Sequence, residues 1–274
     1  MTIGYLIDVE FIWGFQAKII GLSKTSPSFY YPPPTTFLGA LAEVIAKENQ
    51  IGENKGREII PKIAENLLAI GLRPINCVPL KCEDLNRIIA LKLTGGEIYP
   101  DPRNLRSSFD SPASGKTIFS TYNYEAPTIR WFLVFKNETF NLNNKTIKLD
   151  ENIFWKIHRL GSRESLVSCS NVKRVKLEVI HENAFTKYSF PLLRDLILKK
   201  EIEGRWEKEV YIDPFRIKSY VPLKSYIFSE NLITYFIPMK ASPLSEPEYH
   251  IELRKGIVSY SYKDEEVIVG RWLE

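Results

Sequence analysis

The sequence predicts an α+β chain: a ferredoxin-like domain with an inserted thumb-like hairpin, followed by a β-rich C-terminal part. Over residues 1–180 the hydrophobic periodicities follow the order β-α-α-β-β-α-β. A long excursion at 95–127 interrupts this order, and excursions of that length are usually either functional or disordered. Short strands between turn residues fill the last third, so we expect two domains, 1–185 and 186–274.

The individual elements follow from local patterns. Residues 3–12 are β-branched and aromatic and predict a strand, and its continuation through 17–20 after Trp13-Gly14 stays open. The later elements are predicted by the same periodicities: a helix at 56–70 ended by Gly71, strands at 86–94 and 128–136, a helix at 151–160 and a strand at 172–180.

Bulk composition limits the classes of protein. With 44% hydrophobic residues the chain can bury a core, and its formal net charge of +4 permits a local nucleic-acid patch without demanding one. Cys77, Cys82 and Cys169 lack metal-ligand spacing and favour buried thiols in a reducing cytosol. We expect a cytoplasmic protein without membrane contact, because signal-peptide features and apolar runs of about 18 residues are missing.

A proline loop precedes the first predicted helix. Three prolines, Pro32–Pro34, forbid helix there, and Thr35 or Thr36 is expected to cap the helix that follows. The free N–H groups of a helix N-terminus suit a phosphate, and Tyr30 and Tyr31 suit stacking on bases. A capped helix behind a stiff loop, with no ligand, is the alternative.

A basic segment surrounds Gly161. Arg159 and Arg163 flank a glycine that lets the backbone approach a ligand closely, and a guanidinium suits phosphate oxygens. Lys173 and Arg174 follow within one predicted strand and complete the main basic cluster. The alternative is a solvated surface with a salt bridge to a neighbouring carboxylate.

The excursion mixes basic and aromatic residues on a projection, which suits single-stranded nucleic acid or a groove on another subunit. The contacts we predict there are Tyr99, Arg103, Arg106 and Lys116. An irregular surface loop is the alternative interpretation.

Catalytic chemistry finds little support in the sequence. His158, His181 and His250 are scattered, and none neighbours a lysine or a second histidine. Asp8 and Glu10 share a strand face and suit a metal, but a solvated strand face is the stronger interpretation. We therefore predict no catalytic residue, no metal and no cofactor.

Two segments together resemble the Cas-five family of CRISPR-associated RAMP proteins, and its archaeal type I-A branch in particular. PPPTTFLGALAEVIA at 32–46 resembles the family's proline loop and first helix. LGSRESLVSCSNV at 160–172 resembles the glycine-centred segment before the last strand of the family's domain.

The resemblance implies an RNA-recognition-motif-like domain with a thumb at about 95–127. It implies a Cascade subunit that binds the 5′ handle of the guide RNA and caps a row of Cas-seven subunits. Contact with the large Cascade subunit is also implied, and contact with target DNA only indirectly. The implied handle site comprises Thr35, Thr36, Arg159, Gly161, Ser162 and Arg163.

Three functions stay open: a non-catalytic handle-binding subunit, which we favour, a guide-precursor endoribonuclease, and a purely structural assembly subunit. The type I-C branch of the family cuts its precursor with a Tyr, a Lys and an adjacent His. No Lys-His or His-Lys pair occurs in this sequence, including beside Lys116. We therefore expect no enzymatic activity.

Overall fold

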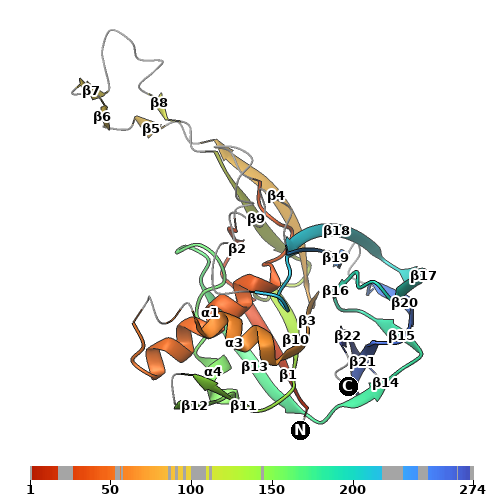
Figure 1. The fold of residues 1–274 in the computed structure, drawn as a ribbon. Coiled ribbons are helices and arrows are strands. Elements are labelled where there is room, and N and C mark those ends of the chain that lie inside the picture. Colours follow the sequence, from red (N-terminus) through yellow and green to blue (C-terminus); the bar gives the residue numbers. More distant parts are fainter. Residues whose placement is uncertain are drawn as a thin grey trace.

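A four-stranded antiparallel sheet organises the protein, seen in a computed structural model (Figure 1). The structure describes residues 2–17, 27–52, 56, 58–85, 88–89, 92–94, 97–99, 109–110, 113–142, 145–217, 231–239, 246–263 and 265–271. The strands, in the order β13-β1-β10-β3, are β13 Val167–Val175, β1 Ile3–Phe11, β10 Thr128–Phe135 and β3 Leu67–Pro74.

The sheet is covered on both faces. The described helices pack on one face: α1 Pro34–Glu48, α3 Ile59–Asn66 and α4 Glu151–Trp155 (Figure 1). Because strand side chains alternate, Tyr5 and Ile7 of β1 face the helices, whereas Leu6 packs against Ile268 of the C-terminal part. The predicted strand-rich α+β class is confirmed. None of the described helices has the length and hydropathy that a membrane crossing requires.

The predicted helix at 56–70 is wrong over its C-terminal part. α3 ends at Asn66, and the chain continues directly into β3. Residues 67–72 are apolar and buried, and periodicity cannot separate such a run in a doubly covered strand from a helix segment. Gly71 does not end a helix; a Cβ there would lie 2.3 Å from the carbonyl oxygen of Ser189.

A long hairpin projects from the body (Figure 1). Its arms are β4 Cys77–Leu85 and β9 Ala113–Thr121, and β2 Gly14–Phe15 pairs with β9 at its foot. Further out lie two short pairs, β5 Ile88–Ile89 with β8 Phe109–Asp110 and β6 Lys92–Thr94 with β7 Glu97–Tyr99. The excursion predicted at 95–127 is therefore part of a hairpin whose first arm starts at Cys77, and β4 largely precedes the strand predicted at 86–94.

The remaining strands form small antiparallel sheets. A two-stranded hairpin, β11 Thr139–Leu142 with β12 Lys145–Lys148, precedes α4. The three-stranded C-terminal sheets are β14 Glu178–Ile180, β21 Ile257–Tyr262 and β22 Glu266–Arg271; β15 Asn183–Thr186, β20 Glu248–Leu253 and β17 Leu196–Glu203; and β16 Phe190–Pro191, β19 Leu232–Met239 and β18 Arg205–Ile212.

A buried ion cluster joins the central sheet to the C-terminal part. Arg130 of β10 binds both carboxylate oxygens of Asp8 at 2.5 and 2.8 Å and reaches Glu266 of β22 at 2.6 Å. Arg73 of β3 binds the same glutamate at 2.9 Å, and the Tyr188 hydroxyl donates to it. The solvated face expected for Asp8 is therefore wrong, since this residue is 8% exposed.

The ion cluster responds to acid. Burial alone raises the pKa of Glu266, but the bonds from Arg73, Tyr188 and Arg130 outweigh it and hold the pKa below its ordinary value. A carboxylate with a lowered folded-state pKa contributes stability that is complete above the unfolded value of 4.5 and is lost as the pH falls through the folded pKa. The junction between the two parts therefore weakens in acid.

A second buried carboxylate, that of Glu209 in β18, joins the C-terminal part to the hairpin. It accepts hydrogen bonds from the backbone N–H of Tyr30 at 2.9 Å, the Tyr211 hydroxyl at 2.7 Å and the Lys81 ammonium at 2.7 Å. Burial raises the pKa of Glu209, and Lys81 opposes that rise. One carboxylate thus connects β18, the arm β4 and the chain leading into α1.

We expect Arg130→Met to lower the free energy of unfolding by about 3–5 kcal/mol, because it leaves two buried carboxylates short of a partner. Urea unfolding measures this loss. The control is Arg205→Met, which removes an exposed pair with Glu207 and should change stability by less than about 1 kcal/mol. Equal, small losses in both variants would show that the cluster does not hold the junction.

Candidate nucleic-acid interface

Residues 160–166 form a tight turn that docks on the chain after β1. The backbone N–H of Ser162 donates to the carbonyl oxygen of Gln16 at 3.0 Å, and the Gln16 N–H donates to Ser165 Oγ at 3.0 Å. At Gly161 φ is +122°, and a Cβ would lie 2.7 Å from the Gln16 carbonyl oxygen. The turn therefore needs glycine where it meets residue 16.

The polar groups of the turn largely satisfy one another. Ser162 Oγ donates to the Glu164 carboxylate at 2.9 Å and lies 3.2 Å from the hydroxyl of Ser165, which is fully buried. The indole N–H of Trp13 donates to the Glu164 carbonyl oxygen at 2.9 Å. These contacts leave Arg163 as the exposed cation of the turn.

Arg163 shares its surroundings with Lys116 of β9. The pKa of Glu164 lies below its ordinary value, first because Ser162 donates a hydrogen bond to it, and further because Lys116 and Arg163 are close. Within the described part of the chain, Arg163 forms no ion pair with a carboxylate at salt-bridge distance. Both cations therefore act on the Glu164 carboxylate, one from the turn and one from the arm β9.

Arg159 turns toward α1 instead. Its guanidinium binds the Glu43 carboxylate at 3.1 Å, and Glu43 also binds Lys47 at 2.8 Å. Thr36 lies about two helical turns, or roughly 10 Å, before Glu43 on the same side of α1. Gly39 between them has open space where a Cβ would stand. Arg159 therefore adjoins an open stripe of α1 that ends at Thr36.

The expected threonine cap is wrong. Helix α1 begins at Pro34 with Pro33 as its N-cap, and no side chain caps it. Proline fits the first helical position because the missing N–H has no partner there anyway. The Thr36 N–H donates to the Pro33 carbonyl oxygen at 2.9 Å, and Thr35 and Thr36 are both partly exposed in the first turn.

The two tyrosines before the proline loop belong to the core of the hairpin foot. Tyr31 is fully buried and stacks on Phe119 of β9 with ring centroids 5.9 Å apart. Tyr30 lies under the Lys81 ammonium, 3.5 Å from its ring centroid. The interpretation of Tyr31 as a base-stacking residue is therefore wrong, because no base can reach its ring.

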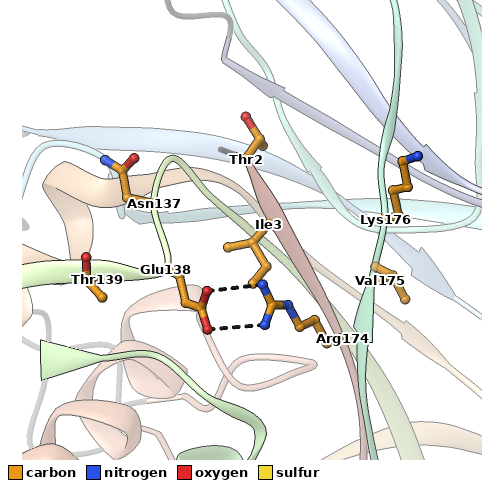
Figure 2. A pocket seen from close by; sticks show the side chains of 8 residues that line it. All are labelled: Thr2, Ile3, Asn137, Glu138, Thr139, Arg174, Val175 and Lys176. Carbon is orange, nitrogen blue, oxygen red and sulfur yellow. Dashed lines mark hydrogen bonds and ion pairs between the residues drawn. The ribbon is translucent and has the colours of Figure 1, made fainter.

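Lys173 and Arg174 do not join the turn. They follow it by a stretch of β13 about 20 Å long, and their side chains leave opposite faces of the sheet. Arg174 binds Glu138 at 3.2 and 3.1 Å beside a surface pocket of about 500 Å³ that Ile3 and Lys176 also line (Figure 2). The prediction of a single basic cluster from Arg159 to Lys176 is therefore wrong.

Of the predicted thumb contacts, two have described positions. Lys116 lies in β9 at the foot of the hairpin, and Tyr99 ends β7 near its far end (Figure 1). Arg103 and Arg106 lie outside the described residues. The described residues hold no group of three or more His, Cys, Asp or Glu side chains that could bind a metal ion.

Sequence reasoning missed an apolar patch beside the turn, formed by Ile12, Leu80, Ile118 and Leu166. These side chains are 43–70% exposed. Leu80 and Ile118 are directly paired across β4 and β9, and the Ile12 N–H donates to the Leu166 carbonyl oxygen at 3.4 Å. The alternation of side chains along β4 and β9 indicates an exposed face, but the residues on it could be combined into a patch only once the pairing of the two strands was known.

Comparisons with known proteins agree with this architecture. No protein-family profile matches the chain. The crystal structure of a CRISPR protein from Archaeoglobus fulgidus is 46% identical, with a TM-score of 0.73 over 99% of this chain and 100% of its own. The CRISPR system aCascade subunit Cas5 1 of Saccharolobus solfataricus is 23% identical over 245 residues, 89% of this chain and 91% of that relative. The CRISPR-associated protein Cas5 3 of the same organism is 23% identical over 250 residues, again 89% of this chain and 91% of that relative.

A chain that is 46% identical to a CRISPR protein over almost its whole length is itself a CRISPR-associated protein. The two Cas5 relatives that match 89% of this chain narrow the assignment from CRISPR-associated proteins in general to one family. The chain belongs to the Cas5 family, and the family resemblance of its two sequence segments is confirmed.

We expect Gly161→Ala to lower the free energy of unfolding by about 3 kcal/mol, since it adds a clash with the Gln16 carbonyl to an unfavourable φ. Gly256→Ala is the matched control, because φ there is +93° and no atom lies within 4 Å of the added Cβ. Its loss should be about 1 kcal/mol. Urea unfolding compares the two, and equal losses would contradict the docking role of Gly161.

Proposed function

We propose that the protein is the Cascade subunit that binds the 5′ handle of the guide RNA and caps the row of Cas-seven subunits, without cutting RNA. The relatives supply the setting: one is named a subunit of aCascade and two are named CRISPR-associated Cas5 proteins. The observation that carries the RNA half of the proposal is that Arg163 is exposed on a turn whose backbone is bound to Gln16, beside the foot of the hairpin.

The turn is suited to holding a phosphate. A guanidinium offers a planar fork of donors to phosphate oxygens, and an ammonium adds a point charge beside it. The backbone beneath Arg163 is fixed by the bonds of Ser162 and Ser165 to Gln16, so less conformational entropy is lost on binding. Arg159 and Thr36 extend the polar surface along α1, although Arg159 must exchange its bond to Glu43 for an RNA contact.

The fold agrees with this role. The strand order β13-β1-β10-β3, with helices on one face, fits the β-α-β-β-α-β arrangement of a ferredoxin-like domain, and we propose that this is its class. The hairpin β4–β9 then corresponds to the thumb of the family. It leaves the sheet between β3 and β10, so the thumb and the turn meet at the same end of the domain.

The apolar patch supports the protein-binding half of the proposal. It consists of two pairs of exposed aliphatic side chains, Leu80 with Ile118 and Ile12 with Leu166, and such residues suit the apolar part of a protein interface. The patch lies on the outer face of the sheet β2-β9-β4, where Gly14 leaves the Ile118 side chain uncovered. A Cas-seven subunit docked there would come within reach of RNA held by Arg163.

A non-cutting role is supported by the placement of the histidines. Metal-independent cleavage needs a general acid and a general base within reach of one phosphodiester. His158 follows α4, His181 lies between β14 and β15, and His250 lies in β20 with its ring stacked on Phe185 at 4.5 Å. None of the three belongs to the turn or to the hairpin foot.

We expect Arg163→Ala to weaken binding of repeat-derived handle RNA by about 1–3 kcal/mol, or about 5- to 150-fold, because a charge-assisted bond to a phosphate is removed. Fluorescence anisotropy at fixed salt measures the affinity. Arg254→Ala, at an exposed arginine of the C-terminal part, is the control and should bind as the parent does.

The same RNA, recovered on a denaturing gel, should be intact. A single cut site would favour the endoribonuclease instead. Unchanged affinity in Arg163→Ala, combined with failure to assemble, would favour a purely structural subunit.

We expect the double variant Leu80→Ser, Ile118→Ser to bind a co-expressed Cas-seven-type subunit at least about tenfold less tightly, because each apolar side chain buried is worth about 1.5–3 kcal/mol. Co-purification followed by titration measures this. The control is Val179→Ser, at another partly exposed aliphatic residue, in β14. Handle affinity of the isolated double variant should stay at the parental value; normal assembly would exclude the patch as the docking face.

A further inference from the structure

A second cationic pocket lies on the face of the central sheet opposite the helices, where the turn between β21 and β22 meets β13. Its volume is about 230 Å³. Lys173 enters it from β13, in register with Leu6, and Lys263 enters from the turn. Lys173 lies six positions, or about 20 Å of strand, after Val167 at the start of β13, so this pocket is distinct from the glycine turn.

The two lysines flank one phenol. The ammonium groups of Lys173 and Lys263 lie 4.9 and 5.6 Å from the centroid of the Tyr262 ring. Neither lysine forms a salt bridge with a carboxylate in the described part of the chain. Lys263 has φ of +55°, so a left-handed backbone position directs it from the turn. Two ammonium groups therefore adjoin the pocket, and neither is paired with a carboxylate among the described residues.

Most carboxylates near the pocket are already bound to arginine side chains. Glu266 lines it but is held by Arg73 and Arg130, and Arg130 is in turn held by Asp8. Glu265 also lines it and is exposed to solvent. The ion cluster is thus internally balanced, and among the described residues that line the pocket the two lysines face one further carboxylate, that of Glu265.

We infer that this pocket binds a phosphate group of a single-stranded nucleic acid, with Lys173 and Lys263 on the phosphate and the Tyr262 ring beside the adjoining nucleotide. Lysine acts as a point charge toward phosphate, and a basic site with an aromatic ring is typical of sequence-tolerant strand binding. The pocket is smaller than the roughly 300–1,000 Å³ of small-molecule sites, which favours one phosphate of a longer strand over a free metabolite.

The phenol provides an independent signal. Hydrogen bonding from Lys173, with the positive charges of both lysines, lowers the pKa of Tyr262 below its ordinary value of 10.0. A bound phosphate offsets those charges, so its presence raises the pKa of Tyr262 again. Phenolate absorbance, assigned by its loss in Tyr262→Phe, therefore reports occupancy without any activity assay.

The test uses the full-length chain carrying Arg163→Ala, so that the turn contributes little to binding. Single-stranded RNA and DNA oligonucleotides unrelated to the repeat are titrated by fluorescence anisotropy over a salt series. Adding Lys173→Gln with Lys263→Gln should weaken binding of both strands at least about tenfold. It should also reduce the slope of log affinity against log salt by about 0.7, because one neutralised phosphate of a single strand accounts for about that much of the slope. Lys255→Gln, at an exposed lysine between β20 and β21, is the control and should change neither quantity.

Two results would overturn the inference. One is parental strand affinity and salt slope in the double lysine variant, with an unchanged unfolding midpoint. The other is a rise in the pKa of Tyr262 with inorganic phosphate but not with either strand, which would make the pocket a small-anion site. The inference does not rest on the proposed function, since handle affinity in Arg163→Ala is read in a separate experiment.

Discussion

The carboxylate of Glu266 holds the molecule together at the place where its two parts meet. It receives Arg73 from the outer strand of the central sheet and Arg130 from the neighbouring strand, and Arg130 also holds Asp8. A buried ion pair gives stability only when nearly all its donors and acceptors are satisfied, and this cluster meets that condition with Tyr188 as a further donor. Both faces of the sheet are therefore committed, one to the helices and one to the C-terminal strands.

With both faces covered by packed elements, two of the sites lie at one end of the sheet and the third lies on the face that the C-terminal strands cover. At one end the glycine turn, β2 and the hairpin foot bring together Arg163, Lys116 and the apolar patch. Beside the β21–β22 turn, Lys173 and Lys263 meet over Tyr262. The proposed RNA site and the proposed protein site thus use chain segments that enter or leave the sheet, which are the segments free to vary in a packed domain. The inferred phosphate pocket instead lies on a face of the sheet, between Lys173 of β13 and the β21–β22 turn.

Much of the fold could be predicted from the sequence, for reasons that particular residues make clear. Residues 128–136 could be predicted as a strand because their apolar run is too short for an ordinary helix. The run from 67 to 72 misled because burial on both faces removes the alternation that marks a strand. Asp8 looked solvated because its partner Arg130 is 122 positions away, and no local pattern announces such a pair.

Part of the candidate site was predicted from the sequence, but the structure gives a different physical reason for it. Gly161 was expected to let a ligand approach the backbone, whereas what approaches is the chain's own Gln16 carbonyl. Lys173 and Arg174 were grouped with the turn by their proximity in sequence, although alternation along a strand sends neighbouring side chains to opposite faces. Lys263 and Tyr262 could not be joined to Lys173 before the long-range pairing of the C-terminal strands was known.

The Glu209 carboxylate has a consequence for how such a protein can diversify. Because it binds the arm β4 through Lys81 and the entry to α1 through Tyr30, a residue of β18 helps to hold the projecting arm in place. Exchanging the last third of the chain between relatives would therefore re-aim the arm unless these three positions travelled together. An exchange that carried Glu209, Lys81 and Tyr30 together would keep the bond between the end of the chain and the projecting arm.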